Sequence, residues 1–186
     1  MVYASHVIFC AYGFWLPNDP RGSWSDFVGS WELYCLGPTK KVDTRVSLAA
    51  TEHDRRARLA AKAALKYPAV SFNDAQITAI AAGFAESLAK GKATCWACSI
   101  LPEHVHMVLA RHQSKVETLV NFLKGAATRM LLQAGLHPFQ AFPDADGQVP
   151  RCWAENEWKV FLDCRPSSTV PPNRWLSYRV QAKEPL

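Results

Sequence analysis

Residues 101–110 read Leu-Pro-Glu-His-Val-His-Met-Val-Leu-Ala, and this stretch decides how the fold is interpreted. Pro102 and Glu103 are typical of a tight turn, and the apolar run after them predicts a strand. Side chains two residues apart in a strand share one face of the sheet, so His104 and His106 lie side by side. Imidazoles buried under apolar packing lose stability unless they find hydrogen-bond partners, so the pair predicts an open, chemically active face.

The segments around this pair predict an alternation of strands and helices. We expect strands at about 6–12, 93–100, 105–111 and 158–162, and helices at about 74–90 and 116–134. The order strand, helix, strand, strand, helix, strand is the split βαβ arrangement of ferredoxin-like domains. We therefore predict an α+β fold, with both main helices on one face of an antiparallel sheet and the other face open.

Residues 15–70 lie outside that order and are interpreted as an insertion. The stretch from Trp15 to Val46 is rich in Pro, Gly and Trp, and irregular stretches of this length are usually functional or ordered by packing. A helix is expected from Thr51, as its cap, to Leu65. We predict one domain over residues 1–163, followed by an aberrant tail at 164–186.

A second candidate for metal binding is Cys95-Trp96-Ala97-Cys98. Residues three apart in an extended strand face opposite sides of the sheet, so the two sulfurs are not expected to share one ion. No second C-x-x-C completes a four-ligand site among the six cysteines. We predict that these thiols are reduced, buried and inert.

The composition is that of a chain with an ample apolar core. Of 186 residues, 49% are hydrophobic, and 21 Lys+Arg against 16 Asp+Glu give a net charge of +5, which permits a polyanionic partner. No apolar stretch approaches the roughly 18 residues that span a bilayer, and no secretory signal is visible. We therefore expect no membrane partner and a cytoplasmic location.

Several segments of the chain resemble the HUH single-tyrosine transposases, a family of insertion-sequence enzymes and their REP-associated relatives. The turn leading into His-hydrophobic-His at 101–110 carries the family signature. Further similar segments lie at 5–9, 12–24, 64–68, 122–128, 135–139 and 153–163. The resemblance covers about residues 1–163, and it rests on segments spread over that whole range.

The resemblance implies the ferredoxin-like fold, with the histidine strand central in the sheet. It implies that His104 and His106 hold a divalent ion, Mg²⁺ or Mn²⁺, against a scissile phosphate. It further implies single-stranded DNA beside a hairpin as substrate, cleaved and transferred by a tyrosine nucleophile in DNA transposition and recombination. Homodimers that exchange tyrosines and members that act alone both occur in this bacterial family, so both assemblies remain open.

The C-terminal segment departs from the family pattern. In relatives, a helix with Tyr-x-x-x-Asn/Gln follows the segment equivalent to 158–163, whereas here 164–178 contains three prolines and would not form that helix. Tyr178 is followed by Gln181 at three residues rather than four. The catalytic nucleophile and the third metal ligand are therefore unassigned.

Three functions remain open on these grounds. The first is a metal-dependent transposase or single-strand endonuclease, and the second is an inactive remnant that binds hairpin DNA without cutting it. The third is an RNA-binding module, which would need aromatic pairs on two central strands. The strands at 93–100 and 105–111 contain one aromatic residue, Trp96, which disfavours the third.

Other residues are candidates for supporting roles. Lys115, Lys124 and Arg129 are predicted phosphate contacts, although a solvated helix face explains them equally well. His6 and His112 are possible extra ligands for which structural roles are preferred, and Asp19 and Arg21 support either the site or their own loop. Packing roles are predicted for five tryptophans: Trp15, Trp24, Trp31, Trp153 and Trp158.

Overall fold

The computed structural model describes the backbone of residues 3–23, 26–42, 48 and 50–162, and the side chains of these residues except 155–162. The strands are β1 (Ala4–Ala11), β2 (Cys95–Ile100), β3 (His104–Ala110) and β4 (Trp153–Leu162). The helices are α1 (Trp31–Tyr34), α2 (Arg55–Ala63), α3 (Asp74–Gly91) and α4 (Val116–Gln133). Strand β4 is longer than predicted, and β3 begins at His104, one residue before the predicted start of that strand.

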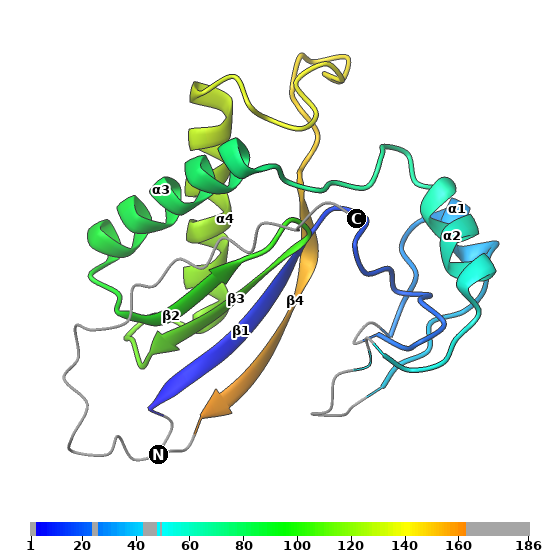
Figure 1. Ribbon diagram of the computed structural model, residues 1–186, viewed down its shortest axis with the longest axis horizontal. Helices are drawn as coiled ribbons and strands as arrows, with labels where there is room; N and C mark the ends of the chain where they lie inside the picture. The colour runs from blue at the N-terminus through cyan, green and yellow to red at the C-terminus, as the bar shows by residue number, and fades with distance from the viewer. Residues whose placement is uncertain (1–2, 24–25, 43–47, 49, 163–186) are drawn as a thin grey trace.

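The four strands form one antiparallel sheet in the order β2-β3-β1-β4. Leaving out α1 and α2, the chain order is β1, α3, β2, β3, α4, β4, which confirms the predicted α+β fold and its split βαβ arrangement (Figure 1). Strand β3 pairs with β2 on one side and β1 on the other, so the histidine strand is central, as expected.

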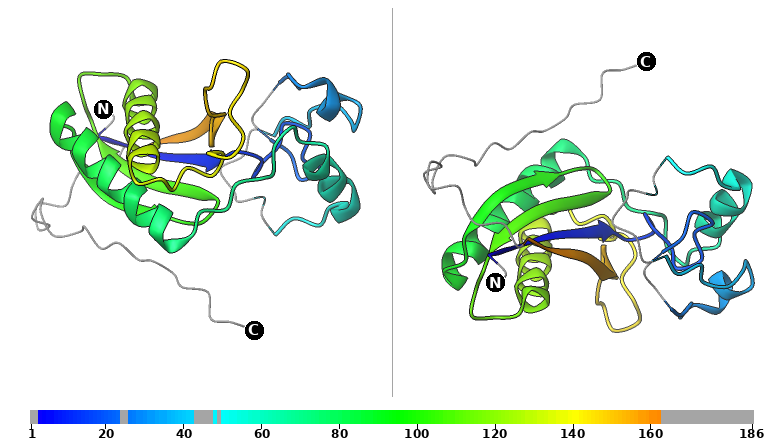
Figure 2. Two further views of the ribbon diagram at one scale, coloured as in Figure 1. Left: turned by 90° about the horizontal axis from the view of Figure 1, so that it is seen from above. Right: turned by 90° about the horizontal axis from the view of Figure 1, so that it is seen from below.

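Helices α3 and α4 cover the same face of the sheet (Figure 2). Helix α3 begins with a capping box, in which the side chains of Asn73 and Gln76 each accept from the other's backbone N–H. It ends at Gly91, one residue beyond the predicted end, and its C-cap residue Lys92 has a left-handed φ of 51°. The two helices approach closely at Gly83, where an added Cβ would lie 2.8 Å from the Ala126 carbonyl oxygen.

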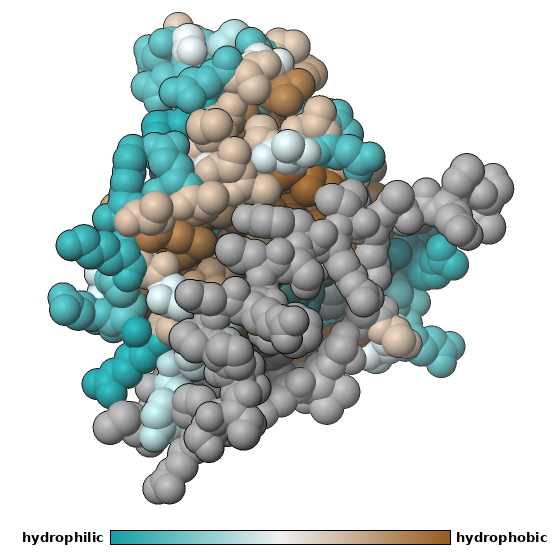
Figure 3. Space-filling view, turned by 60° about the vertical axis from the view of Figure 1, so that its left-hand side comes forward, coloured by the Kyte–Doolittle hydropathy of each residue, from teal (hydrophilic) through white to brown (hydrophobic). Residues whose placement is uncertain are grey.

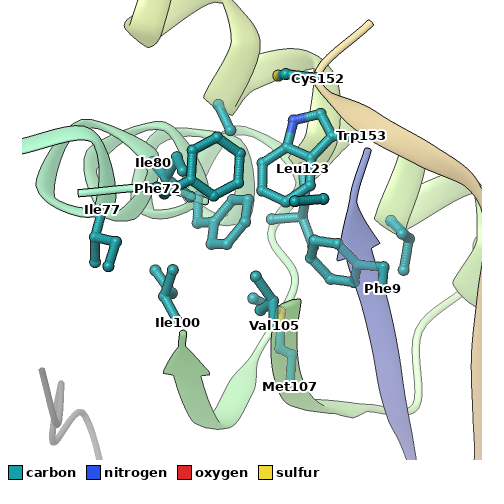
Figure 4. Packing of buried hydrophobic residues seen from close by; sticks show 14 of the residues in the cluster. Phe9, Phe72, Ile77, Ile80, Ile100, Val105, Met107, Leu123, Cys152 and Trp153 are labelled. Carbon is teal, nitrogen blue, oxygen red and sulfur yellow. The ribbon is translucent and has the colours of Figure 1, made fainter. Parts of the chain in front are cut away.

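The main core lies between the sheet and these helices. Alternate residues of β1 and β3 point into it and are fully buried, among them Phe9, Val105 and Met107. Figure 4 shows Phe9, Val105 and Met107 facing the same interior as Leu123 and Trp153. Because strand side chains alternate, the residues between them must lie on the opposite, helix-free face.

The insertion lies beyond the end of β1 and carries α1 and α2 (Figures 1 and 2). Helix α2 begins after Asp54, whose side chain accepts from the Ala57 N–H, so the predicted start at Thr51 is wrong. A small second core of Leu16, Val28, Leu33 and Ala61 holds α1 against α2. This packing explains how an irregular stretch becomes ordered.

The surface seen in Figure 3 has hydrophilic side chains along its margins, with apolar side chains gathered between them. Within the described ranges, no helix has the length and apolar character needed to cross a membrane.

Candidate metal centre on the open face of the sheet

His104 and His106 project together from the helix-free face of β3. Burial alternates along this strand, with Val105 and Met107 sealed in the core and the two histidines partly accessible. The imidazole ring centroids lie 5.0 Å apart, with the ring planes at 69°. The strand thus places both imidazoles side by side, as the spacing predicted.

Phe14, which lies between β1 and the insertion, reaches the site. The ring of Phe14 stacks on His104 with the centroids 5.0 Å apart and the planes 6° from parallel. The Lys62 ammonium of α2 lies over the same Phe14 ring, 5.6 Å from its centroid. Sequence reasoning missed both residues, because their link to His104 depends on the fold of the insertion.

His6 on β1 is the third imidazole of this face. Strand register pairs His106 with Ile8 and Val108 with His6, so His6 and His106 are diagonal neighbours across two strands. The Nε2 of His6 lies 3.2 Å from the Nδ1 of His106, with the ring centroids 5.5 Å apart and the ring planes 21° from parallel. His112 is not part of this cluster, since its Nε2 contacts the Gly91 carbonyl oxygen at 3.1 Å.

Burial keeps this cluster uncharged near neutral pH. Desolvation lowers the pKa of both His6 and His104. Desolvation is also the largest cause at His106, and with the nearby His104 and His6 it lowers the pKa of His106 to about 4. Neutral imidazole is the form that binds metal ions, so no proton has to be removed before an ion can bind.

The spacing of the pair suits a shared ion. Two imidazoles bound to one ion at a right angle, through nitrogen–metal bonds of about 2.1 Å, have centroids about 4.7 Å apart. The observed separation is 5.0 Å. The buried Nδ1 of His104 has no hydrogen-bond partner among the described residues, so it has an unmet need that a ligand would satisfy.

Among the described residues, the pair is not joined by a third protein ligand. In the part of the chain that the structure describes, no group of three or more His, Cys, Asp or Glu side chains is arranged to hold a metal ion. The described residues therefore fit a two-histidine site that leaves further coordination positions to other groups. Tyr178 and Gln181, considered above as nucleophile and amide ligand, lie outside the described residues.

The Cys95-x-x-Cys98 pair lies on the other face of the sheet. A register shift between Cys95 and Ala97 breaks the alternation, so both cysteines pack against the main core. The prediction that they face opposite sides is therefore wrong, because a bulge adds one residue to the strand. Burial raises the pKa of Cys95 to about 11 and that of Cys98 to about 12, as expected for unreactive thiols.

The three candidate DNA contacts on α4 differ in their surroundings. Lys124 is 8% exposed, and its ammonium donates to the Ala154 carbonyl oxygen. Because this ammonium is buried and has a protein acceptor, we no longer propose Lys124 as a phosphate contact. Arg129 is exposed on the helix layer. Its charge acts on Glu86 of α3, whose pKa is lowered chiefly by the Lys90 hydrogen bond and also by Arg129. Lys115, at the start of α4, is exposed, and its contact with DNA stays a prediction.

Asp19 and Arg21 tie down their own loop. Arg21 donates from Nε and from a terminal nitrogen to the two oxygens of Asp19, at 2.8 and 2.7 Å, and both residues are buried. The guanidinium also lies 3.8 Å from the centroid of the Trp15 ring, which confirms a packing role for Trp15. Trp153 is likewise buried, but Trp31 is 73% exposed, so the packing role predicted for Trp31 is wrong.

Comparisons with known proteins show a distant structural similarity. No family model matches the sequence, and no curated protein matches it. Among solved structures, the chain is similar to a REP-associated tyrosine transposase bound to a REP hairpin, with a TM-score of 0.43 and 8% sequence identity. The match covers 88% of this chain and 58% of that structure's chain.

Proposed function

We propose that this chain is a transposase-like DNA-binding protein that holds a divalent ion, Mg²⁺ or Mn²⁺, between His104 and His106. The observation that carries the proposal is the pair of neutral imidazoles, with centroids 5.0 Å apart, on the helix-free face of a central strand. When bound, such an ion supplies Lewis-acid polarisation of a phosphate oxygen. The resemblance of the HUH segment to single-tyrosine transposases favours DNA as the source of that phosphate.

The residues around the pair suit a polyanionic ligand. Lys62 lies next to Phe14, which stacks on His104, so a cation from the insertion lies at the edge of the site. Basic side chains of this kind supply sequence-independent affinity for nucleic acid. Phe14 covers one side of the His104 ring and limits the orientations that the ring can take.

Cleavage and transfer of single-stranded DNA beside a hairpin is the enzymatic form of the proposal. It requires a nucleophile, and the tyrosine that the sequence offers, Tyr178, lies outside the described residues. The second form is a remnant that binds hairpin DNA without cutting it. The altered spacing of Tyr178 and Gln181 favours this second form. Both forms of the proposal allow the site to be carried by one chain or by a homodimer.

An RNA-binding module is less well supported. The helix-free positions of the central strands β1 and β3 hold His6, Ile8, Cys10, His104, His106 and Val108. None of these is Phe, Tyr or Trp, so the aromatic platform on which such modules stack bases is missing from these positions.

A single experiment separates these forms. Purified protein is incubated with Mn²⁺ and a labelled DNA hairpin that carries single-stranded flanks. Binding is measured by fluorescence anisotropy, and covalent adducts are measured on denaturing gels. An adduct that is lost in His106→Ala supports the enzyme. Hairpin binding without any adduct supports the remnant and overturns the nuclease, and absence of hairpin binding overturns both.

A further inference from the structure

The contact between His6 and His106 bears on which nitrogen of His106 can bind an ion. The His6 Nε2 and His106 Nδ1 atoms lie 3.2 Å apart, within hydrogen-bond distance. A neutral imidazole carries one N–H, so one of these two nitrogens donates and the other accepts. The two possible directions of this hydrogen bond have opposite consequences for metal binding.

If His6 donated, the lone pair of His106 Nδ1 would be used and the His106 proton would sit on Nε2. Neither nitrogen of His106 would then be available to an ion. If His106 donates from Nδ1, its Nε2 lone pair is free, and His6 holds its own proton on Nδ1. Histidines that bind metals commonly donate their other N–H to a partner that fixes the ring.

We infer that His6 is a positioning residue: its Nε2 accepts a hydrogen bond from His106 Nδ1–H and so directs the Nε2 lone pair of His106 to the ion. This inference rests on the proposed metal site. It assigns His6 a role other than the structural one preferred for it, or the direct ligation considered for it, from the sequence. The cross-strand register supports it, because Ile8 pairs with His106 and holds the two strands where His6 reaches that ring diagonally.

The position of His6 also restricts the His106 ring. The planes of the two rings are 21° from parallel with centroids 5.5 Å apart, while His104 lies edge-on to His106. Phe14 stacks in turn on His104. The order Phe14, His104, His106, His6 is thus a continuous row of ring contacts, and His6 closes one end of it.

The inference makes a prediction for the protein without metal. Two-bond ¹H–¹⁵N spectra of histidine-labelled protein distinguish the two neutral tautomers. We expect His6 and His106 both to carry their proton on Nδ1. In His6→Ala, His106 should shift towards the Nε2–H form, whereas His112→Ala, which removes a histidine outside the row, should leave the His106 signals unchanged. Finding His106 as the Nε2–H tautomer in the unsubstituted protein would overturn the inference.

Metal affinity supplies the second measurement. Loss of a partner that orients a ligand typically weakens metal binding by about 10- to 100-fold. We expect that loss of Mn²⁺ affinity in His6→Ala, and partial recovery in His6→Gln, whose amide oxygen can accept the same hydrogen bond. Equal Mn²⁺ affinity in His6→Ala and the unsubstituted protein would overturn the positioning role.

Failure of the metal site itself would look different. If His6 and His106 of the unsubstituted protein are both found as the Nδ1–H tautomer but the protein does not bind Mn²⁺, the hydrogen bond is as assigned and the proposed function is wrong. Diamagnetic Zn²⁺ distinguishes a positioning role from direct ligation. Zn²⁺ should shift the Nε2 signals of His106 and leave the Nε2 of His6 as a hydrogen-bond acceptor. A Zn²⁺-bound signal at His6 Nε2 would overturn the positioning role.

Discussion

Strands β3 and β2 are neighbours in the sheet, and each carries a pair of residues that binds metal ions in other proteins. On β3, His104 and His106 lie on the helix-free face, where their rings meet Phe14 and His6. On β2, Cys95 and Cys98 both lie on the covered face, where they pack against the core. All four side chains are partly buried, but they lie on opposite faces of one sheet, so the face decides which groups surround each pair more than the spacing does.

The strongest way to sharpen this comparison is to substitute adjacent residues of β3. Met107 is 1% exposed and its replacement by Ala leaves a cavity, so we expect Met107→Ala to lower the free energy of unfolding by about 2–5 kcal/mol. His106→Ala, on the open face, should cost about 1 kcal/mol or less at pH 7. Urea unfolding followed by circular dichroism measures both. Similar losses in the two variants would mean that the faces are not distinct.

The cysteines offer a second way. With a pKa of about 11, only about one thousandth of Cys95 is thiolate at pH 8, so alkylation of the native protein should be slow at Cys95 and slower at Cys98. We expect Cys95 to react about 100-fold more slowly than the exposed Cys35, and Cys98 about tenfold more slowly than Cys95. Mass spectrometry of iodoacetamide-treated protein reads each site separately. Equal rates at Cys95 and Cys35 would place the β2 pair on an accessible surface.

The loss of stability in acid provides a third test, because part of that loss should come from His106 on the open face. The pKa of His106 is about 4 in the folded protein and near 6.5 when unfolded, so the unfolded chain gains the proton first as the pH falls. The part of the stability that depends on neutral His106 is therefore fully present above pH 6.5 and is lost as the pH falls towards 4. We expect a loss of about 1–2 kcal/mol from His106, after discounting for its contact with solvent. His106→Gln should remove that part, and an unchanged pH profile in this variant would contradict the assignment.

The smallest expected effect concerns the lysine that the insertion brings to the site. Lys62→Gln should weaken hairpin binding several-fold and reduce the slope of log affinity against log salt by about 1. Arg129→Gln is the matched control, since Arg129 lies on the helix layer. Fluorescence anisotropy at several salt concentrations measures both slopes. A larger change for Arg129→Gln would indicate that DNA lies against the helices.

Much of the sheet could be predicted from sequence because its strands obey a period of two. That alternation placed His104 and His106 on one face, opposite Val105 and Met107. The same rule failed at Cys95 and Cys98, because a bulge adds a residue that no local pattern announces. Lys124 was misplaced because its ammonium finds a carbonyl partner inside the protein, which depends on how β4 packs.

The surroundings of the histidine pair were beyond sequence reasoning. Phe14 contacts His104 from the segment after β1, Lys62 reaches Phe14 through the fold of the insertion, and His6 reaches His106 through strand register. Each of these contacts joins residues that are far apart in the chain. Periodicity describes neighbours within one element, so it indicates the pair but not the residues that orient it.

The central claim is that His104 and His106 together hold one divalent ion on the open face. Isothermal titration of Mn²⁺ into the full chain tests it directly, with His104→Ala and His106→Ala compared against a Cys95→Ser, Cys98→Ser double variant. The account predicts that each histidine substitution abolishes binding, while the cysteine variant binds as the unsubstituted protein does. Unchanged Mn²⁺ affinity in His106→Ala would contradict it.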